Sequence, residues 1–139
     1  MARPEPTVGA TAEASWIVEE TDLASRLSDG HAGSFPPVFS TARMVALMEL
    51  AAARVLSPIL APGEVSVGVL VNVTHTAATP PGARVRATAR FLGQEEKFYA
   101  FEVVALDEAG EIGRGAHRRA IVESERLVRG ARKRAGFAL

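Results

Sequence analysis

Residues 41–56 read TARMVALMELAAARVL, and this stretch decides the fold. It contains no glycine or proline, and most of its residues are strong helix formers. Ser40 or Thr41 can cap its start, and Pro58 predicts an end just before that proline. Its apolar surface is interrupted by three charged residues, Arg43, Glu49 and Arg54. A helix that is apolar nearly all round is normally enclosed by the rest of the protein.

After this helix the apolar pattern changes to the alternation that is typical of strands. Between residues 65 and 75, valines at odd positions and His75 form one row, which we expect to face the helix. Short turns between successive strands imply antiparallel neighbours. The predicted strands are residues 11–20, 65–75, 83–91, 98–106 and 112–122.

These elements predict an α+β fold in which one antiparallel five-stranded sheet wraps around one long central helix. A sheet with a helix packed on one face is the alternative. We expect a single domain over residues 1–139, with a loose N-terminus at 1–10 and a basic C-terminal tail at 125–139. The glycine- and proline-rich loop 28–37 is typical of a lid or binding loop.

The composition excludes several classes of protein. Hydrophobic residues make up 47% of the 139 residues and charged residues 23%, which is ordinary for a globular chain. The 16 basic and 16 acidic residues cancel, so we expect neither nucleic acid nor membrane as a partner. The lack of cysteine excludes disulfides and thiolate nucleophiles, and three scattered histidines indicate no metal site. No signal-like or membrane-spanning run is present, so a cytoplasmic location is expected.

Glu49 and His75 are the first two candidates for chemistry. A carboxylate inside an apolar helix is costly unless it is paired or protonated. Glu49 therefore suits a general base or a group that orients a histidine, although pairing with an arginine such as Arg54 is the alternative. His75 ends the valine row at the rim of the predicted core, where it suits proton transfer or a purely structural role.

Thr41 is the third candidate, at the start of the helix. Its hydroxyl either caps the helix or lies at the positive end of the helix dipole, where negative charge is stabilised. Eight residues of helix separate Thr41 from Glu49 by about 12 Å, so the two side chains cannot touch along one helix. They are expected to flank a substrate or to act together across a subunit interface.

Four stretches carry a resemblance to a known family. FPPVFST (35–41), MVALME (44–49), VTHTAATPPG (73–82) and EIGRGAHRRA (111–120) resemble the fluoroacetyl-CoA thioesterase family of hot-dog proteins. The likeness extends over roughly residues 11–125. It implies a hot-dog fold, a homodimer or a tetramer of such dimers, and active sites at the dimer interface. It also implies hydrolysis of a small acyl-CoA to the acid and free CoA, without a cofactor beyond the CoA of the substrate.

The resemblance also implies roles for individual residues. The catalytic threonine, glutamate and histidine of the family fall on Thr41, Glu49 and His75. Its substrate-contacting glycine falls on Gly68, where a backbone N–H can approach a thioester carbonyl. Its arginine near the site falls on Arg119, although composition alone leaves Arg114 and Arg118 equally available.

The loop over the acyl pocket departs from the family pattern. Of two phenylalanines that the fluoroacetyl-specific enzyme has there, Phe35 matches one and Ala32 replaces the other. A missing ring removes much of an apolar lid, so a different or broader acyl group is expected. Two alternatives to a thioesterase stay open: a non-catalytic acyl-CoA binding or sensing protein, and a hydratase acting on enoyl thioesters.

Overall fold

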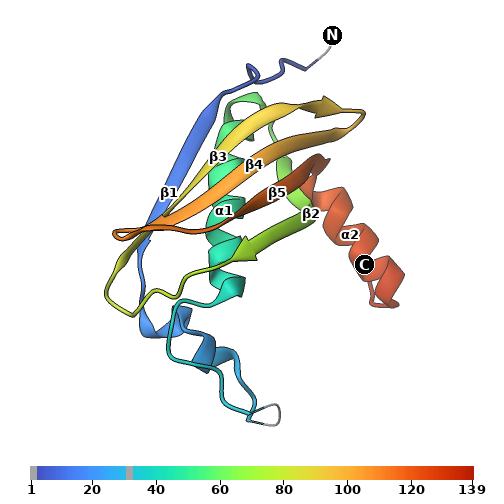
Figure 1. Ribbon diagram of the computed structural model, residues 1–139. Helices are drawn as coiled ribbons and strands as arrows, with labels where there is room; N and C mark the ends of the chain where they lie inside the picture. Colours follow the sequence, from blue (N-terminus) through green and yellow to red (C-terminus); the bar gives the residue numbers. More distant parts are fainter. Residues whose placement is uncertain (1–2, 31–32) are drawn as a thin grey trace.

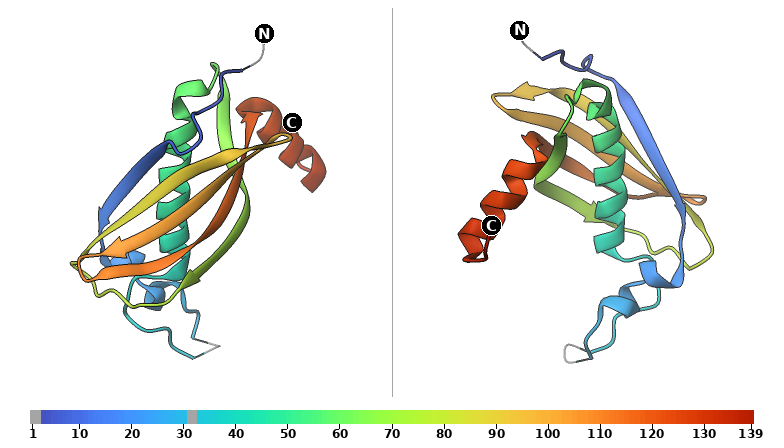
Figure 2. Two further views of the ribbon diagram at one scale, coloured as in Figure 1. Left: turned by 45° about the horizontal axis from the view of Figure 1, so that its top comes forward. Right: turned by 180° about the vertical axis from the view of Figure 1, so that it is seen from behind.

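The computed structural model describes residues 3–30 and 33–139. One curved antiparallel sheet wraps around the helix α1 (Thr41–Leu56), which lies along its concave side (Figures 1 and 2). The strand order is β1-β3-β4-β5-β2, so β1 and β2 form the edges. The strands are β1 (Thr11–Ile17), β2 (Glu64–His75), β3 (Arg84–Glu95), β4 (Phe98–Asp107) and β5 (Gly110–Glu123). The predicted five-stranded sheet around one helix is therefore confirmed.

The core lies between α1 and the inner faces of β1, β3 and β4. One stripe of α1 is buried: Met44, Leu47, Met48, Ala51, Ala52, Val55 and Leu56. The inner row of β3, from Val85 to Phe91, is fully buried, as its alternation predicts. Ser40 caps α1, since its side chain accepts a hydrogen bond from the Arg43 backbone N–H at 3.1 Å. The helix is thus capped and packed along one face, and its N-terminus lies at one end of the sheet (Figure 1).

Strand β2 differs from the prediction of one continuous valine row facing the helix. Its pairing with β5 shifts between Gly68 and Leu70, which marks a bulge that changes the alternation. Before the bulge Gly68 faces α1, and after it Val73 packs against the core. Val65 and Val69 are instead 37% and 47% exposed. The expectation of a single row was wrong because one inserted residue exchanges the two faces of a strand.

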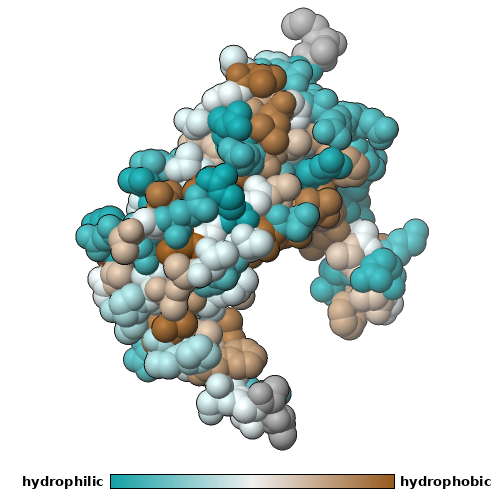
Figure 3. All heavy atoms as spheres, viewed as in Figure 1, coloured by the Kyte–Doolittle hydropathy of each residue, from teal (hydrophilic) through white to brown (hydrophobic). Residues whose placement is uncertain are grey.

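Two features lie away from this core. The basic C-terminal tail forms the helix α2 (Ser124–Ala135), which projects from the end of β5 as a separate arm (Figures 1 and 3). The loop before α1 contains the short helices η1 (Glu20–Asp22) and η2 (Ala24–Leu27), and η3 (Ser57–Ile59) follows α1. Within residues 3–30 and 33–139, no helix is long and apolar enough to cross a membrane.

Candidate active site

Thr41 and His75 meet at the N-terminus of α1. Ser40 caps the helix, so the Thr41 hydroxyl is not needed as the cap. Its Oγ1 lies 2.9 Å from His75 Nδ1 instead. Thr41 is exposed, and the orphan N–H groups of the first helical turn make its surroundings favourable to negative charge. The structure thus joins two of the three residues predicted to be catalytic.

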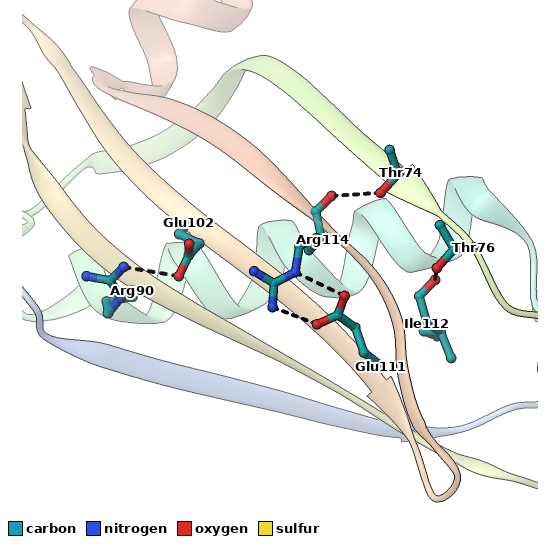
Figure 4. A network of polar contacts seen from close by, with 7 residues as sticks. All are labelled: Thr74, Thr76, Arg90, Glu102, Glu111, Ile112 and Arg114. Carbon is teal, nitrogen blue, oxygen red and sulfur yellow. Dashed lines mark hydrogen bonds and ion pairs between the residues drawn. The ribbon is translucent and has the colours of Figure 1, made fainter.

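The end of β2 holds His75 in place. The hydroxyls of its neighbours Thr74 and Thr76 donate to the carbonyls of Arg114 and Ile112 on β5, at 3.4 and 3.3 Å (Figure 4). Burial lowers the pKa of His75 below 6.5, and the Ala77 backbone opposes this only in part. The ring is therefore neutral at pH 7 and able to accept a proton. Its Nε2 is buried and has no hydrogen-bond partner among the described residues.

A hollow of about 360 Å³ opens beside this pair. Its walls are mostly apolar, and Thr41, His75 and Thr76 supply polar side chains to the lining. The remaining lining residues are Ala24, Pro36, Val38, Phe39, Ala77 and Ala78. A larger hollow of about 530 Å³ lies between Trp16, Asp22 and Arg43, but it contains no hydroxyl–imidazole pair. The smaller hollow is the better candidate because a small apolar site with few polar groups is typical of ligand pockets.

Glu49 lies in a second cluster, farther along α1. Its Oε2 accepts a hydrogen bond from Arg119 Nη1 at 2.9 Å. Arg119 is only 6% exposed. It donates two further hydrogen bonds to Ser66, from Nε to the hydroxyl and from Nη2 to the backbone carbonyl. The carboxylate is thus paired with a buried guanidinium, while its own side chain remains 38% exposed. Arg54, the partner considered from sequence, instead donates to the Glu13 carbonyl.

Gly68 lies directly against this carboxylate. A Cβ added at Gly68 would approach Glu49 Oε2 to 2.3 Å, which real Cβ atoms essentially never do. Gly68 is also paired with Arg119 across the β2–β5 ladder. The lack of a side chain at this position therefore leaves the space that the Glu49 carboxylate occupies.

The remaining predicted residues lie elsewhere. Of the three arginines that composition left open, only Arg119 reaches Glu49: Arg114 pairs with Glu111 at 2.6 Å and Arg118 with Glu95 at 3.3 Å. A similar surface pair joins Arg90 and Glu102 on the neighbouring strands (Figure 4). Phe35 is 43% exposed in the loop before α1 and does not line the hollow. Ala32, with its neighbour His31, lies outside the described residues.

His117 is the site residue that the sequence reading missed. It is 2% exposed, and its ring joins Arg119 to the bulge of β2. The spacing of His117 and Arg119 could have identified it, because residues two positions apart in a strand lie on the same face. Among the described residues, no group of three histidine, aspartate or glutamate side chains is placed to hold a metal ion.

Comparison with known proteins agrees with this fold. Residues 18–125 match the family of fluoroacetyl-CoA-specific thioesterases. The fluoroacetyl-CoA thioesterase of Streptantibioticus cattleyicolor is 47% identical over 93 residues, which cover 67% of each chain. A crystal structure of the fluoroacetyl-CoA thioesterase FlK superposes with a TM-score of 0.87 and 38% identity, covering 94% of this chain and 98% of that one. A phenylalanine-to-alanine mutant of FlK in complex with fluoroacetate and CoA superposes with a TM-score of 0.80 and 40% identity, covering 86% of this chain and 98% of that one.

The sheet wrapped around one helix, together with the similarity to FlK and to the curated relative, makes this chain a hot-dog thioesterase. Such a protein is a thioester hydrolase. Within this class, the chain belongs to the family of fluoroacetyl-CoA-specific thioesterases.

Proposed function

We propose that the protein hydrolyses the thioester of a small acyl-CoA, with Thr41, Glu49 and His75 as its catalytic residues. The observation that carries the proposal is the contact of 2.9 Å between the Thr41 hydroxyl and the neutral His75 ring, beside an apolar hollow. The size of that hollow favours a short acyl group. The FlK mutant complex with fluoroacetate and CoA supports the choice of acyl-CoA over other thioesters. The reaction needs no cofactor beyond the CoA of the substrate, and the lack of cysteine favours the cytoplasm.

In the mechanism that this pair favours, Thr41 Oγ1 attacks the thioester carbonyl while its proton moves to His75 Nδ1. The C–S bond breaks, His75 returns the proton to the departing CoA sulfur, and the acyl group remains on Thr41 as an ester. Water then cleaves that ester and regenerates the hydroxyl. In the alternative mechanism, Glu49 or His75 takes a proton from water directly, and Thr41 stabilises the oxyanion.

The proposal gives the remaining residues supporting roles. The Gly68 backbone N–H is assigned to the substrate carbonyl, beside the Glu49 carboxylate that lies against this residue. Arg119 keeps Glu49 ionised and oriented, since its donors already bind Glu49 and Ser66. That Phe35 covers the acyl group stays a prediction from the family resemblance, since its ring lies outside the lining of the hollow.

We further propose that a homodimer completes the site. Thr41 and Glu49 lie about 12 Å apart on one helix, too far to act on one bond within one chain. In a catalytic triad the orienting carboxylate binds the ring nitrogen opposite the nucleophile. In His75 that nitrogen is Nε2, because Nδ1 contacts Thr41, and Nε2 has no hydrogen-bond partner among the described residues. The edge strand β2, which carries both His75 and Gly68, exposes Val65, Val69, Leu70 and Val71. An exposed apolar edge of this kind is a ready template for pairing with a second copy.

Sedimentation equilibrium tests the dimer. We expect a mass of twice the 14.7 kDa of the chain, or of four times that value if dimers associate. Val69→Lys, which places a charge on the exposed edge of β2, is expected to shift the protein towards monomer and to lower turnover in parallel. Monomeric protein with full activity would contradict the shared site.

A thiol-release assay over a panel of short acyl-CoAs tests the function itself. We expect release of free CoA from acetyl-, fluoroacetyl- and propionyl-CoA. Discrimination between the first two is expected to be weak, because alanine at residue 32 supplies no aromatic ring. Saturable binding without thiol release would indicate the acyl-CoA binding protein instead. Loss of enoyl absorbance without thiol release would indicate the hydratase.

A further inference from the structure

His117 is a buried histidine to which neither the family resemblance nor the proposed chemistry assigns a role. It lies on the inner face of β5, between the Phe101 ring, whose centroid is 6.4 Å away, and the Glu49–Arg119 pair. Its Nδ1 is 2.8 Å from the Leu70 carbonyl, and its Nε2 is 3.2 Å from Arg119 Nη1. Both ring nitrogens are therefore occupied by the protein itself.

The direction of these two hydrogen bonds follows from the partners. A guanidinium only donates and a carbonyl only accepts. His117 Nε2 must therefore accept from Arg119, and Nδ1–H must donate to Leu70. This assignment requires a neutral ring with its proton on Nδ1. A protonated ring would turn an N–H toward Arg119 and place two positive charges side by side.

The location of the two partners links separate parts of the site. Leu70 is the first paired residue after the β2 bulge, and Gly68 is the last paired residue before it. Arg119 is the partner of Glu49. The His117 ring also borders the space beside Gly68, since a Cβ added there would lie 3.3 Å from His117 Cε1. One side chain thus contacts Leu70 at the bulge and Arg119, and it lies next to the glycine.

We propose that His117 is a positioning residue, whose neutral ring ties Arg119, and through it the Glu49 carboxylate, to the bulge of β2. The inference rests on the proposed catalytic role of Glu49. His117 itself touches neither substrate nor reacting atoms. Its function is to keep the Arg119 guanidinium from rotating away from Glu49. Gly68 on β2 lies against the same carboxylate.

The electrostatic surroundings of the ring agree with the neutral form. Burial lowers the pKa of His117 below 6.5, and the Arg119 charge lowers it further. The Leu70 carbonyl and the Glu49 carboxylate on α1 act in the opposite direction. The ring therefore remains an acceptor for Arg119 at neutral pH.

Two amide substitutions separate the two hydrogen bonds. The amide of glutamine can occupy the place of Nε2 and accept from Arg119, whereas the amide of asparagine can occupy only the place of Nδ1 and donate to Leu70. We expect His117→Asn to lower kcat by up to about 100-fold with little change in KM. We expect His117→Gln to keep kcat within about 3-fold of the wild type. A purely structural histidine would instead give equal losses in both variants, in step with their melting temperatures, and that result would overturn the proposal.

A double-mutant cycle with Glu49→Gln tests whether the effect passes through Glu49. We expect His117→Asn to lower kcat in the wild type but not in the Glu49→Gln background, because interacting residues are not additive. Full additivity would overturn the link between the two residues. Nitrogen-15 NMR of the imidazole gives a readout without activity: the proton must be on Nδ1, and a proton on Nε2 overturns the proposal. If Glu49→Gln alone keeps full turnover, the proposed function of Glu49 fails, and the NMR result still decides the hydrogen-bond arrangement.

Discussion

His75→Ala is expected to lower kcat for acyl-CoA hydrolysis by about 10²- to 10⁴-fold, the usual contribution of a general acid–base group. The His75 ring is hydrogen-bonded to the Thr41 hydroxyl at 2.9 Å. Without it the hydroxyl retains its proton and is a poor nucleophile. Thiol release measured under saturating acyl-CoA gives kcat, and KM is expected to change little. Thermal unfolding of the variant provides the control, since the ring lies at the rim of the fold.

The pH dependence of the wild type tests the same assignment. Burial lowers the pKa of His75, so the neutral, proton-accepting ring persists below pH 6.5 and is lost only as the pH falls through the lowered value. The acid limb of kcat/KM should therefore have its midpoint below pH 6.5. A midpoint at or above that pH, or an unchanged acid limb in His75→Ala, would argue against His75 as the base.

Glu49→Gln is expected to have a comparable effect, again about 10²- to 10⁴-fold in kcat. Glutamine preserves the shape of the side chain and can still accept from Arg119, but it carries no charge and cannot serve as a base. The buried Arg119 guanidinium loses its counter-charge, so the variant should also melt at a lower temperature. The cost should lie below the about 3–5 kcal/mol of a fully buried pair, because the Glu49 side chain is 38% exposed. Activity is therefore measured well below the melting temperature.

The Glu49 carboxylate can also be displaced without changing its charge. In Gly68→Ala the new Cβ would lie 2.3 Å from Glu49 Oε2, so the carboxylate must move. Turnover is expected to fall while the net charge of the site stays the same. Gly130→Ala in α2 is the matched control, because a Cβ there meets nothing within 4 Å and alanine favours a helix. Wild-type turnover in Gly68→Ala would show that the position of the carboxylate does not matter.

Much of the fold was accessible from local patterns. The helix over residues 41–56 has the bounds of α1 because a serine cap and a downstream proline define both ends. The prediction of the inward-facing residues of β3 was also correct, since the alternation in this strand is uninterrupted. In β2 the same argument was wrong, because valines continue through the bulge and conceal the change of face. A bulge is set by the pairing with β5, which a single strand does not reveal.

By itself, the sequence determined the helix, the five strands and three chemically notable side chains, because propensity, alternation and a charge in an apolar helix are local properties. Only the tertiary structure decided which groups meet. Thr41 contacts His75 across 34 positions and Glu49 contacts Arg119 across 70. It also showed that Arg119, and not Arg114 or Arg118, is the partner of Glu49. His117 contacts that arginine. The physical reason is that strand register and the bulge of β2 set these contacts, and both depend on pairing between segments far apart in the chain.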